Sequence, residues 1–166
     1  MRTPMRTTLT LILALALAGC GGDDPADPSG GNTGGDGLSC KVDGVSWTAP
    51  LTAAHLISGV VSIAGTDASS SLGVGLGFLN GGTGTYTVGP GSPITACAVT
   101  EGLNDAWSAS GDQGSGTITV TTLSSTRVAG TFSFTAPRSN GAGDPATRTV
   151  TEGTFNLPIT TFDPNP

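Results

Sequence analysis

Short runs of alternating apolar and polar residues fill most of this chain. The clearest are 116–123 and 128–135, where Ile118 and Phe132 lie on apolar faces and threonines occupy the opposite faces. Alternation with a period of two is typical of strands that bury one face. These two runs therefore predict a β-hairpin.

Other short runs of the same kind predict further strands. They cover 39–42, 45–49, 53–57, 60–65, 72–78, 84–88, 95–100, 106–110 and 153–159. Asp43-Gly44, Asn80-Gly81-Gly82 and Asn140-Gly141 supply residues suited to tight turns. Because each sheet has one apolar face, a second sheet must cover it. We predict an all-β fold, an antiparallel β-sandwich, with a closed β-barrel as the alternative.

The first twenty residues follow a different pattern. Arg2 and Arg6 precede an apolar run from Leu9 to Ala18. As a helix, ten such residues span about 15 Å, half of a hydrocarbon core of about 30 Å. The segment is therefore expected to be a secretion signal rather than a permanent membrane span.

The apolar run ends in Leu17-Ala18-Gly19-Cys20. This sequence resembles the lipobox of bacterial lipoproteins, in which Leu and two small residues precede a Cys at the cleavage point. The resemblance implies a signal peptide over 1–19, cleavage before Cys20 and attachment of lipid to its sulfur. Several acyl chains give stable anchoring, whereas one is marginal. The alternative is an ordinary secreted protein in which a Cys follows the cleavage site by chance.

Gly21 stands where many inner-membrane lipoproteins have Asp, so the resemblance implies an outer-membrane location, with the membrane face left open. Residues 20–38 are rich in Gly, Asp and Pro and are predicted to be a flexible tether. A calcium site is the alternative interpretation of its carboxylates, but their spacing fits neither an EF-hand loop nor a repeated glycine-rich calcium array, and we predict no metal. These carboxylates are Asp23, Asp24, Asp27 and Asp36.

Composition limits the function classes. Gly (27) and Pro (11) disfavour long helices, and a net charge of −6 excludes a basic groove for nucleic acid. The length leaves room for one domain, predicted over 39–162, with a short tail at 163–166.

Cys40 and Cys97 remain once Cys20 carries lipid, and an exported protein favours a disulfide between them. On the chain-entropy model, closing a loop of this length stabilises the fold by roughly 4 kcal/mol. The alternative is a pair of buried free thiols.

Candidate catalytic residues are few. His55 is the only histidine, and no nucleophile motif accompanies it. Glu101 and Asp105 are the closest pair of loop carboxylates, although their sequence context favours solvated turn charges over a catalytic pair. We assign no catalytic residues and no cofactor, and we expect a protein that is not an enzyme.

Trp47, Tyr86 and Trp107 are candidate stacking platforms for a glycan, although the pattern favours burial of the tryptophans in the core. Gly-Thr-aromatic recurs at 84–86, 130–132 and 153–155, which we interpret as strand openings. The segments GTYTVG, GTFSFTA and GTFNLP resemble uncharacterised all-β domains that follow lipoprotein signals, and this resemblance implies no activity.

The sequence thus predicts an outer-membrane lipoprotein that displays a non-catalytic β domain. The predicted function is a binding or adhesion module for a glycan or an envelope protein, with the lipid anchor as its membrane contact. A structural or accessory subunit of an envelope complex is the alternative. A hydrolytic enzyme is a third, less favoured hypothesis. An exposed apolar patch would favour the accessory role.

Overall fold

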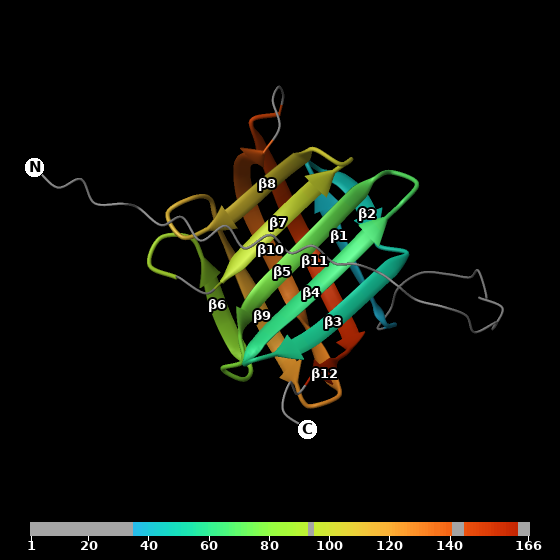
Figure 1. Ribbon diagram of the computed structural model, residues 1–166, viewed down its shortest axis with the longest axis vertical. Helices are drawn as coiled ribbons and strands as arrows, with labels where there is room; N and C mark the ends of the chain where they lie inside the picture. The colour runs from blue at the N-terminus through green and yellow to red at the C-terminus, as the bar shows by residue number, and fades with distance from the viewer. Residues whose placement is uncertain (1–34, 93–94, 141–144, 163–166) are drawn as a thin grey trace, which may run out of the picture. The chain divides into compact units, whose positions relative to one another are not determined.

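The computed structural model of the chain describes residues 35–92, 95–140 and 145–162. These residues form twelve strands and no helix (Figure 1). The strands are β1 (Gly37–Val42), β2 (Val45–Thr48), β3 (Leu51–Ile57), β4 (Val60–Asp67), β5 (Leu72–Leu79), β6 (Gly84–Val88), β7 (Ala96–Glu101), β8 (Asp105–Ser110), β9 (Ser115–Leu123), β10 (Arg127–Asn140), β11 (Thr147–Pro158) and β12 (Thr160–Phe162). Nothing in the described part is a helix of the length and hydropathy that a membrane crossing needs.

Several predicted segments lie outside the described residues. They are the signal peptide 1–19, the lipobox with Cys20, the tether up to residue 34 and the tail 163–166. Strand β1 begins at Gly37, two residues before the predicted start of the domain, because Leu38 is part of the buried core.

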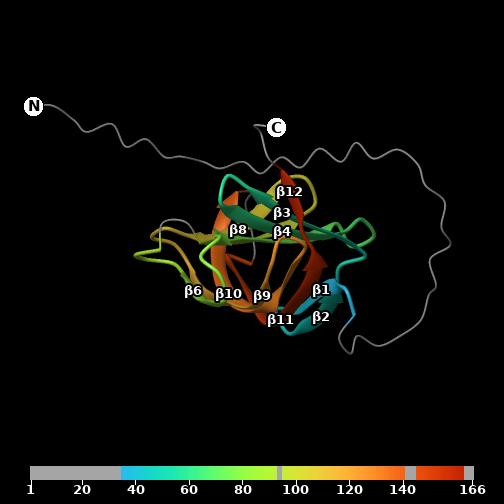
Figure 2. The same cartoon turned by 90° about the horizontal axis from the view of Figure 1, so that it is seen from below.

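The strands lie in two layers that face each other across the core (Figure 2). The first sheet has the order β6-β9-β10-β11-β1-β2, and the second has β12-β3-β4-β5-β7-β8. Neighbouring strands are antiparallel, apart from the parallel pair β12 and β3. The predicted all-β antiparallel sandwich is confirmed.

Two strand continuations connect the layers. The last residues of β10 leave the first sheet and pair with β8, where Arg138 lies opposite Trp107. Beyond β11, the chain passes Ile159 and continues as β12 beside β3 of the second sheet. The layers are therefore parts of one curled sheet, so the sandwich has a partly barrel-like character.

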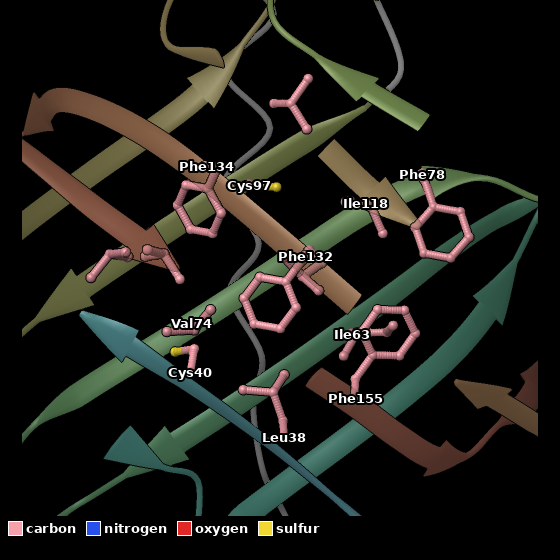
Figure 3. Packing of buried hydrophobic residues seen from close by; sticks show 14 of the residues in the cluster. Leu38, Cys40, Ile63, Val74, Phe78, Cys97, Ile118, Phe132, Phe134 and Phe155 are labelled. Atoms are coloured by element: carbon pink, nitrogen blue, oxygen red, sulfur yellow. The ribbon is translucent and has the colours of Figure 1, made fainter. Parts of the chain in front are cut away.

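Inward-facing side chains from both sheets form a single core (Figure 3). The predicted hairpin is confirmed as β9 and β10, with Ile118, Phe132 and Phe134 buried and the alternating threonines pointing outward. The ring of Phe132 packs with that of Phe155, with centroids 6.3 Å apart. Core burial on the scale of a few kcal/mol per large side chain is what holds the layers together.

The C-terminal strands are longer than predicted. Strand β10 extends to Asn140, the first residue of the predicted Asn140-Gly141 turn, and Gly141 lies outside the described residues. Strand β11 starts at Thr147 rather than at residue 153. A β-bulge, with Glu152 at a φ of 52°, interrupts the alternation in β11 and hides its first half from a period-two pattern.

The Gly-Thr-aromatic motifs have different positions from those predicted. Only 84–86 begins a strand, β6. The segments 130–132 and 153–155 lie inside β10 and β11 and pair with each other, so the prediction that they open strands is wrong for both. Thr131 lies opposite Thr154, and each glycine lies opposite the other motif's phenylalanine.

Candidate functional site

The predicted aromatic platforms do not lie on the surface. Trp47 and Trp107 are only 9% and 1% exposed and belong to the core. The ring of Tyr86 is half-buried against Phe78, with centroids 4.8 Å apart, and its hydroxyl donates to the Gly82 carbonyl at 2.6 Å. These rings therefore provide no exposed stacking surface for a sugar, and the core interpretation of both tryptophans is correct.

Cys40 and Cys97 are two free buried thiols rather than a disulfide. Both side chains point into the core, but Cys40 comes from β1 of the first sheet and Cys97 from β7 of the second. Figure 3 shows the two sulfurs well apart, on different strands. A disulfide needs Cα atoms within about 7 Å, so inward orientation alone does not bring the thiols into range.

The residues considered for catalysis do not converge. His55 lies on the outer side of β3, opposite Ser62. Glu101 and Asp105 pair across the β7–β8 turn, but each carboxylate binds an arginine instead of facing a cleft. Within the described part of the chain, no three His, Cys, Asp or Glu side chains form a group able to hold a metal ion.

Trp107 is the centre of a cluster that sequence reasoning missed. The guanidinium carbons of Arg138 and Arg148 lie 4.3 Å and 4.7 Å from its ring centroid. Its Nε1 donates to the Pro145 carbonyl at 2.8 Å. At these distances a guanidinium is attracted to the aromatic face. The two arginines therefore cover this edge of the core.

Three carboxylates surround the same arginines. Arg138 binds Asp105 at 2.5 Å, and Arg148 binds Asp43 at 2.7 Å as well as Glu101. These contacts join the β1–β2 turn, the β7–β8 turn and the ends of β10 and β11. Since both cations are already paired, the cluster is suited to fastening strand ends rather than to capturing an anion.

A larger polar surface lies on the outer face of the first sheet. Strand register places one hydroxyl residue from each of β6, β9, β10, β11, β1 and β2 in a continuous row. The row is Thr85, Thr119, Thr131, Thr154, Ser39 and Thr48. Neighbouring hydroxyls are in hydrogen-bond contact at two steps, Thr85–Thr119 at 3.3 Å and Ser39–Thr154 at 3.0 Å.

Further rows on this face have nearly the same composition. One contains Thr87, Thr117 and Ser133 on one side and Lys41 and Ser46 on the other, and a shorter one contains Ser115, Thr135 and Thr149. We call these rows together the hydroxyl face. Its lysine is neutralised by Glu152 at 2.8 Å. An open depression of about 220 Å³ is part of it, lined by residues that include Ser115, Ser133, Thr135, Thr149 and Thr151.

The hydroxyl face consists mainly of Ser and Thr side chains. Each hydroxyl donates one hydrogen bond and accepts others, so the face matches a partner whose groups also both donate and accept. Alternation predicted that the threonines of β9 and β10 point outward. It did not predict a row across six strands, because that row depends on the register of strands far apart in the sequence.

Comparison with protein families gives one match, to the DUF6252 model, a domain of unknown function, over residues 37–157. The chain therefore belongs to the DUF6252 family. The matched segment runs from the first residue of β1 to the last but one residue of β11. Comparisons with curated proteins and with solved structures found no match.

Proposed function

We propose that this chain is a lipid-anchored protein of the bacterial outer membrane whose β domain binds neutral polysaccharide through the hydroxyl face. The lipobox Leu17-Ala18-Gly19-Cys20 supports the anchor. The observation that carries the binding role is the row from Thr85 to Thr48, which places hydroxyls on six adjacent strands. The domain acts as a binding module rather than an enzyme.

The chemistry of the hydroxyl face favours a neutral, extended ligand. One hydrogen bond contributes only about 0.5–1.5 kcal/mol net, because the same groups bond to water in the free state. A single sugar therefore gains little on this surface, whereas a polymer lying along the row makes many such bonds. Display of many anchored copies on one membrane adds avidity.

Binding is tested with the purified full chain in detergent and a panel of insoluble polysaccharides. Cellulose, chitin and xylan are the neutral members, and calcium alginate is the anionic one. We expect the chain to be retained by a neutral polysaccharide and not by alginate. Absence of retention on every neutral polymer would contradict the proposal.

A hydroxyl-deletion variant locates the surface. Thr119→Val, Thr131→Val and Thr154→Val together remove three neighbouring hydroxyls and keep side-chain shape. Loss of three hydrogen bonds is expected to weaken binding by about tenfold or more. The matched control is Thr52→Val, Thr66→Val and Thr100→Val on the second sheet, which should bind normally. Equal binding by both triple variants would place the ligand elsewhere.

The anchor has its own test. Mass spectrometry of the chain extracted from membranes should find a mature amino terminus at Cys20 that carries diacylglycerol. An unmodified Cys20, or cleavage at another residue, would overturn the lipoprotein assignment without affecting the binding test.

A second candidate function is an accessory subunit of an envelope complex. It is favoured by the exposure of Leu51, Ile57 and Leu79 at the borders of the second sheet.

A further inference from the structure

The outer face of the second sheet is built mostly from Gly, Ala and Ser. Register arranges its residues in rows across β3, β4, β5, β7 and β8. The two central rows are Ala53–Ala64–Gly75–Ala98–Ser108 and His55–Ser62–Gly77–Ala96–Ser110, with Leu51–Thr66–Gly73–Thr100–Ala106 on one side and Ile57–Val60–Leu79 on the other. Because most of its side chains are small, we call this surface the flat face. None of its positions has a carboxylate, a lysine or an arginine.

At two positions in its centre, nothing inside the domain requires the residue to be glycine. A Cβ added to Gly75 or Gly77 would meet its nearest atoms at 3.9 Å and 4.0 Å, which is ordinary contact, and neither residue has a positive φ. Gly73 is different, because a Cβ there would lie 2.6 Å from Thr100 Oγ1. Glycine weakens a strand interior and often marks a place where another backbone approaches closely. At Gly75 and Gly77 that approach must come from outside the domain.

Exposed apolar side chains border the flat face. Leu51 is 58% exposed at one end of β3, and Ile57 and Leu79 are 45% and 42% exposed in the row at the other end. These are most of the large apolar side chains exposed on the described surface. Apolar residues gathered at the edges of an uncharged face are typical of a surface that another protein covers.

We infer that the flat face is the contact surface between two copies of this chain. The net charge of −6 makes two copies repel each other, so they approach best where neither presents a charge. The flat face meets that condition, because none of its positions carries a carboxylate, a lysine or an arginine. Two-fold symmetric contacts of this kind are the commonest in oligomers.

Symmetry gives the contact a definite arrangement. A two-fold axis that runs parallel to the rows, between the two central ones, places Gly75 of one copy opposite Gly77 of the other. The same axis places Leu51 opposite Ile57. Glycine facing glycine allows the two sheets to approach more closely than the usual spacing of about 10 Å.

The size of the flat face indicates how strong the contact is. Strands about 4.8 Å apart and rows about 6.7 Å apart give a surface of roughly 500 Å² per copy. Two copies would bury roughly 1,000 Å², the lower limit of a specific interface. The dimer is therefore weak and reversible, and confinement of both copies to one membrane favours it.

Cysteine crosslinking of the purified full chain in detergent tests the dimer. Ser62→Cys places a thiol beside the proposed axis, and Thr131→Cys places one on the hydroxyl face as the matched control. With a short bismaleimide that joins two thiols across a gap, we expect a crosslinked dimer from Ser62→Cys at about fivefold the yield from Thr131→Cys. The unsubstituted chain measures any contribution from Cys20.

A charge substitution makes the test specific. Gly77→Lys in the Ser62→Cys chain would bury an unpaired charge in the contact and should reduce the crosslinked dimer by about fivefold or more. Thr117→Lys, on the other sheet, should leave the yield unchanged. Circular dichroism checks that each variant is folded.

Two results would overturn the inference. One is equal crosslinking from Ser62→Cys and Thr131→Cys, and the other is a yield that Gly77→Lys does not change. Because the assay contains neither polysaccharide nor a bilayer, its failure is distinct from failure of the proposed function.

Discussion

The ring of Phe132 lies directly over Gly153 of the neighbouring strand. A Cβ built on Gly153 would be 2.6 Å from three atoms of that ring. The relationship is reciprocal, since Gly130 lies opposite Phe155 and a Cβ on Gly130 would be 2.7 Å from its Cζ. The two Gly-Thr-Phe segments thus pack against each other symmetrically, and each glycine leaves space for the phenylalanine ring of the other segment.

Alanine at Gly153 is expected to destabilise the fold. The added methyl group must displace the Phe132 ring, which is buried, and overpacking of this kind costs about 1–3 kcal/mol. Urea unfolding followed by fluorescence measures the change. The control is Gly75→Ala, also inside a strand, where the space is open and the free energy of unfolding should stay the same or rise. A Gly153→Ala chain as stable as the parent would show that Phe132 does not need the glycine.

Alanine at Gly130 is expected to have a larger effect. Its Cβ would lie 2.1 Å from the carbonyl oxygen of Thr119, and backbone cannot rotate away as a ring can. We predict a loss greater than that of Gly153→Ala, at about 3 kcal/mol or more. The same unfolding experiment compares the two variants, and the reverse order would contradict the explanation.

The sequence predicted those parts of the fold that depend on local pattern. The alternation around Ile118 and Phe132 gave the β9–β10 hairpin and its buried face, and Asp43-Gly44 gave a turn whose φ values of 49° and 82° are both positive. The pairing of 130–132 with 153–155 was not predicted, because a spacing along the chain does not reveal register. Without the register, the repeated Gly-Thr-aromatic motif indicates only the starts of strands.

Site prediction was limited in the same way. Trp107 was recognised as a core candidate, but its contacts with Arg138 and Arg148 come from the far ends of β10 and β11. The hydroxyl face was visible only as outward threonines on individual strands. Alternation along a strand indicates which side chains point inward, but it does not give the distance between side chains of opposite sheets. Cys40 and Cys97 are both buried, and the predicted disulfide between them is absent from the structure.

Replacement of Arg148 by Met should destabilise the domain measurably. The variant loses the cation–π contact with Trp107 and leaves Asp43 and Glu101 without their shared partner. We expect a loss of about 2 kcal/mol in the free energy of unfolding. Lys41→Met is the matched control, because Lys41 and Glu152 form an exposed pair and such pairs contribute about 0–1 kcal/mol. Equal losses would mean that Arg148 has no special role at this end of the core.

The carboxylate of Asp67 is predicted to titrate below its usual range. Hydrogen bonds from the side chains of Ser69 and Ser70 and from the backbone of Ser69 lower its pKa from 3.8. A lowered pKa means that this group stabilises the fold above pH 3.8 and that the contribution is lost as the pH falls. Carbon-13 NMR titration measures the pKa directly. In Ser69→Ala the pKa should move back towards 3.8, and an unchanged value would show that these bonds do not form in solution.

The two buried thiols predict a loss of stability in alkali. Burial raises the pKa of Cys40 and of Cys97 from 9.0 to about 12. Between these values the unfolded chain releases thiol protons that the folded chain retains. The free energy of unfolding is therefore unaffected by these groups below pH 9 and falls as the pH rises towards 12.

Comparison of two chains isolates this effect from other groups that titrate in alkali. The free energy of unfolding of the Cys20→Ser chain should fall more steeply between pH 8 and pH 10.5 than that of Cys20→Ser with Cys40→Ala and Cys97→Ala. In the first chain, iodoacetamide at pH 8 should label neither thiol until urea is added, because only a thiolate reacts. Rapid labelling without urea would show that the core opens at β1 or β7 far more readily than its packing indicates.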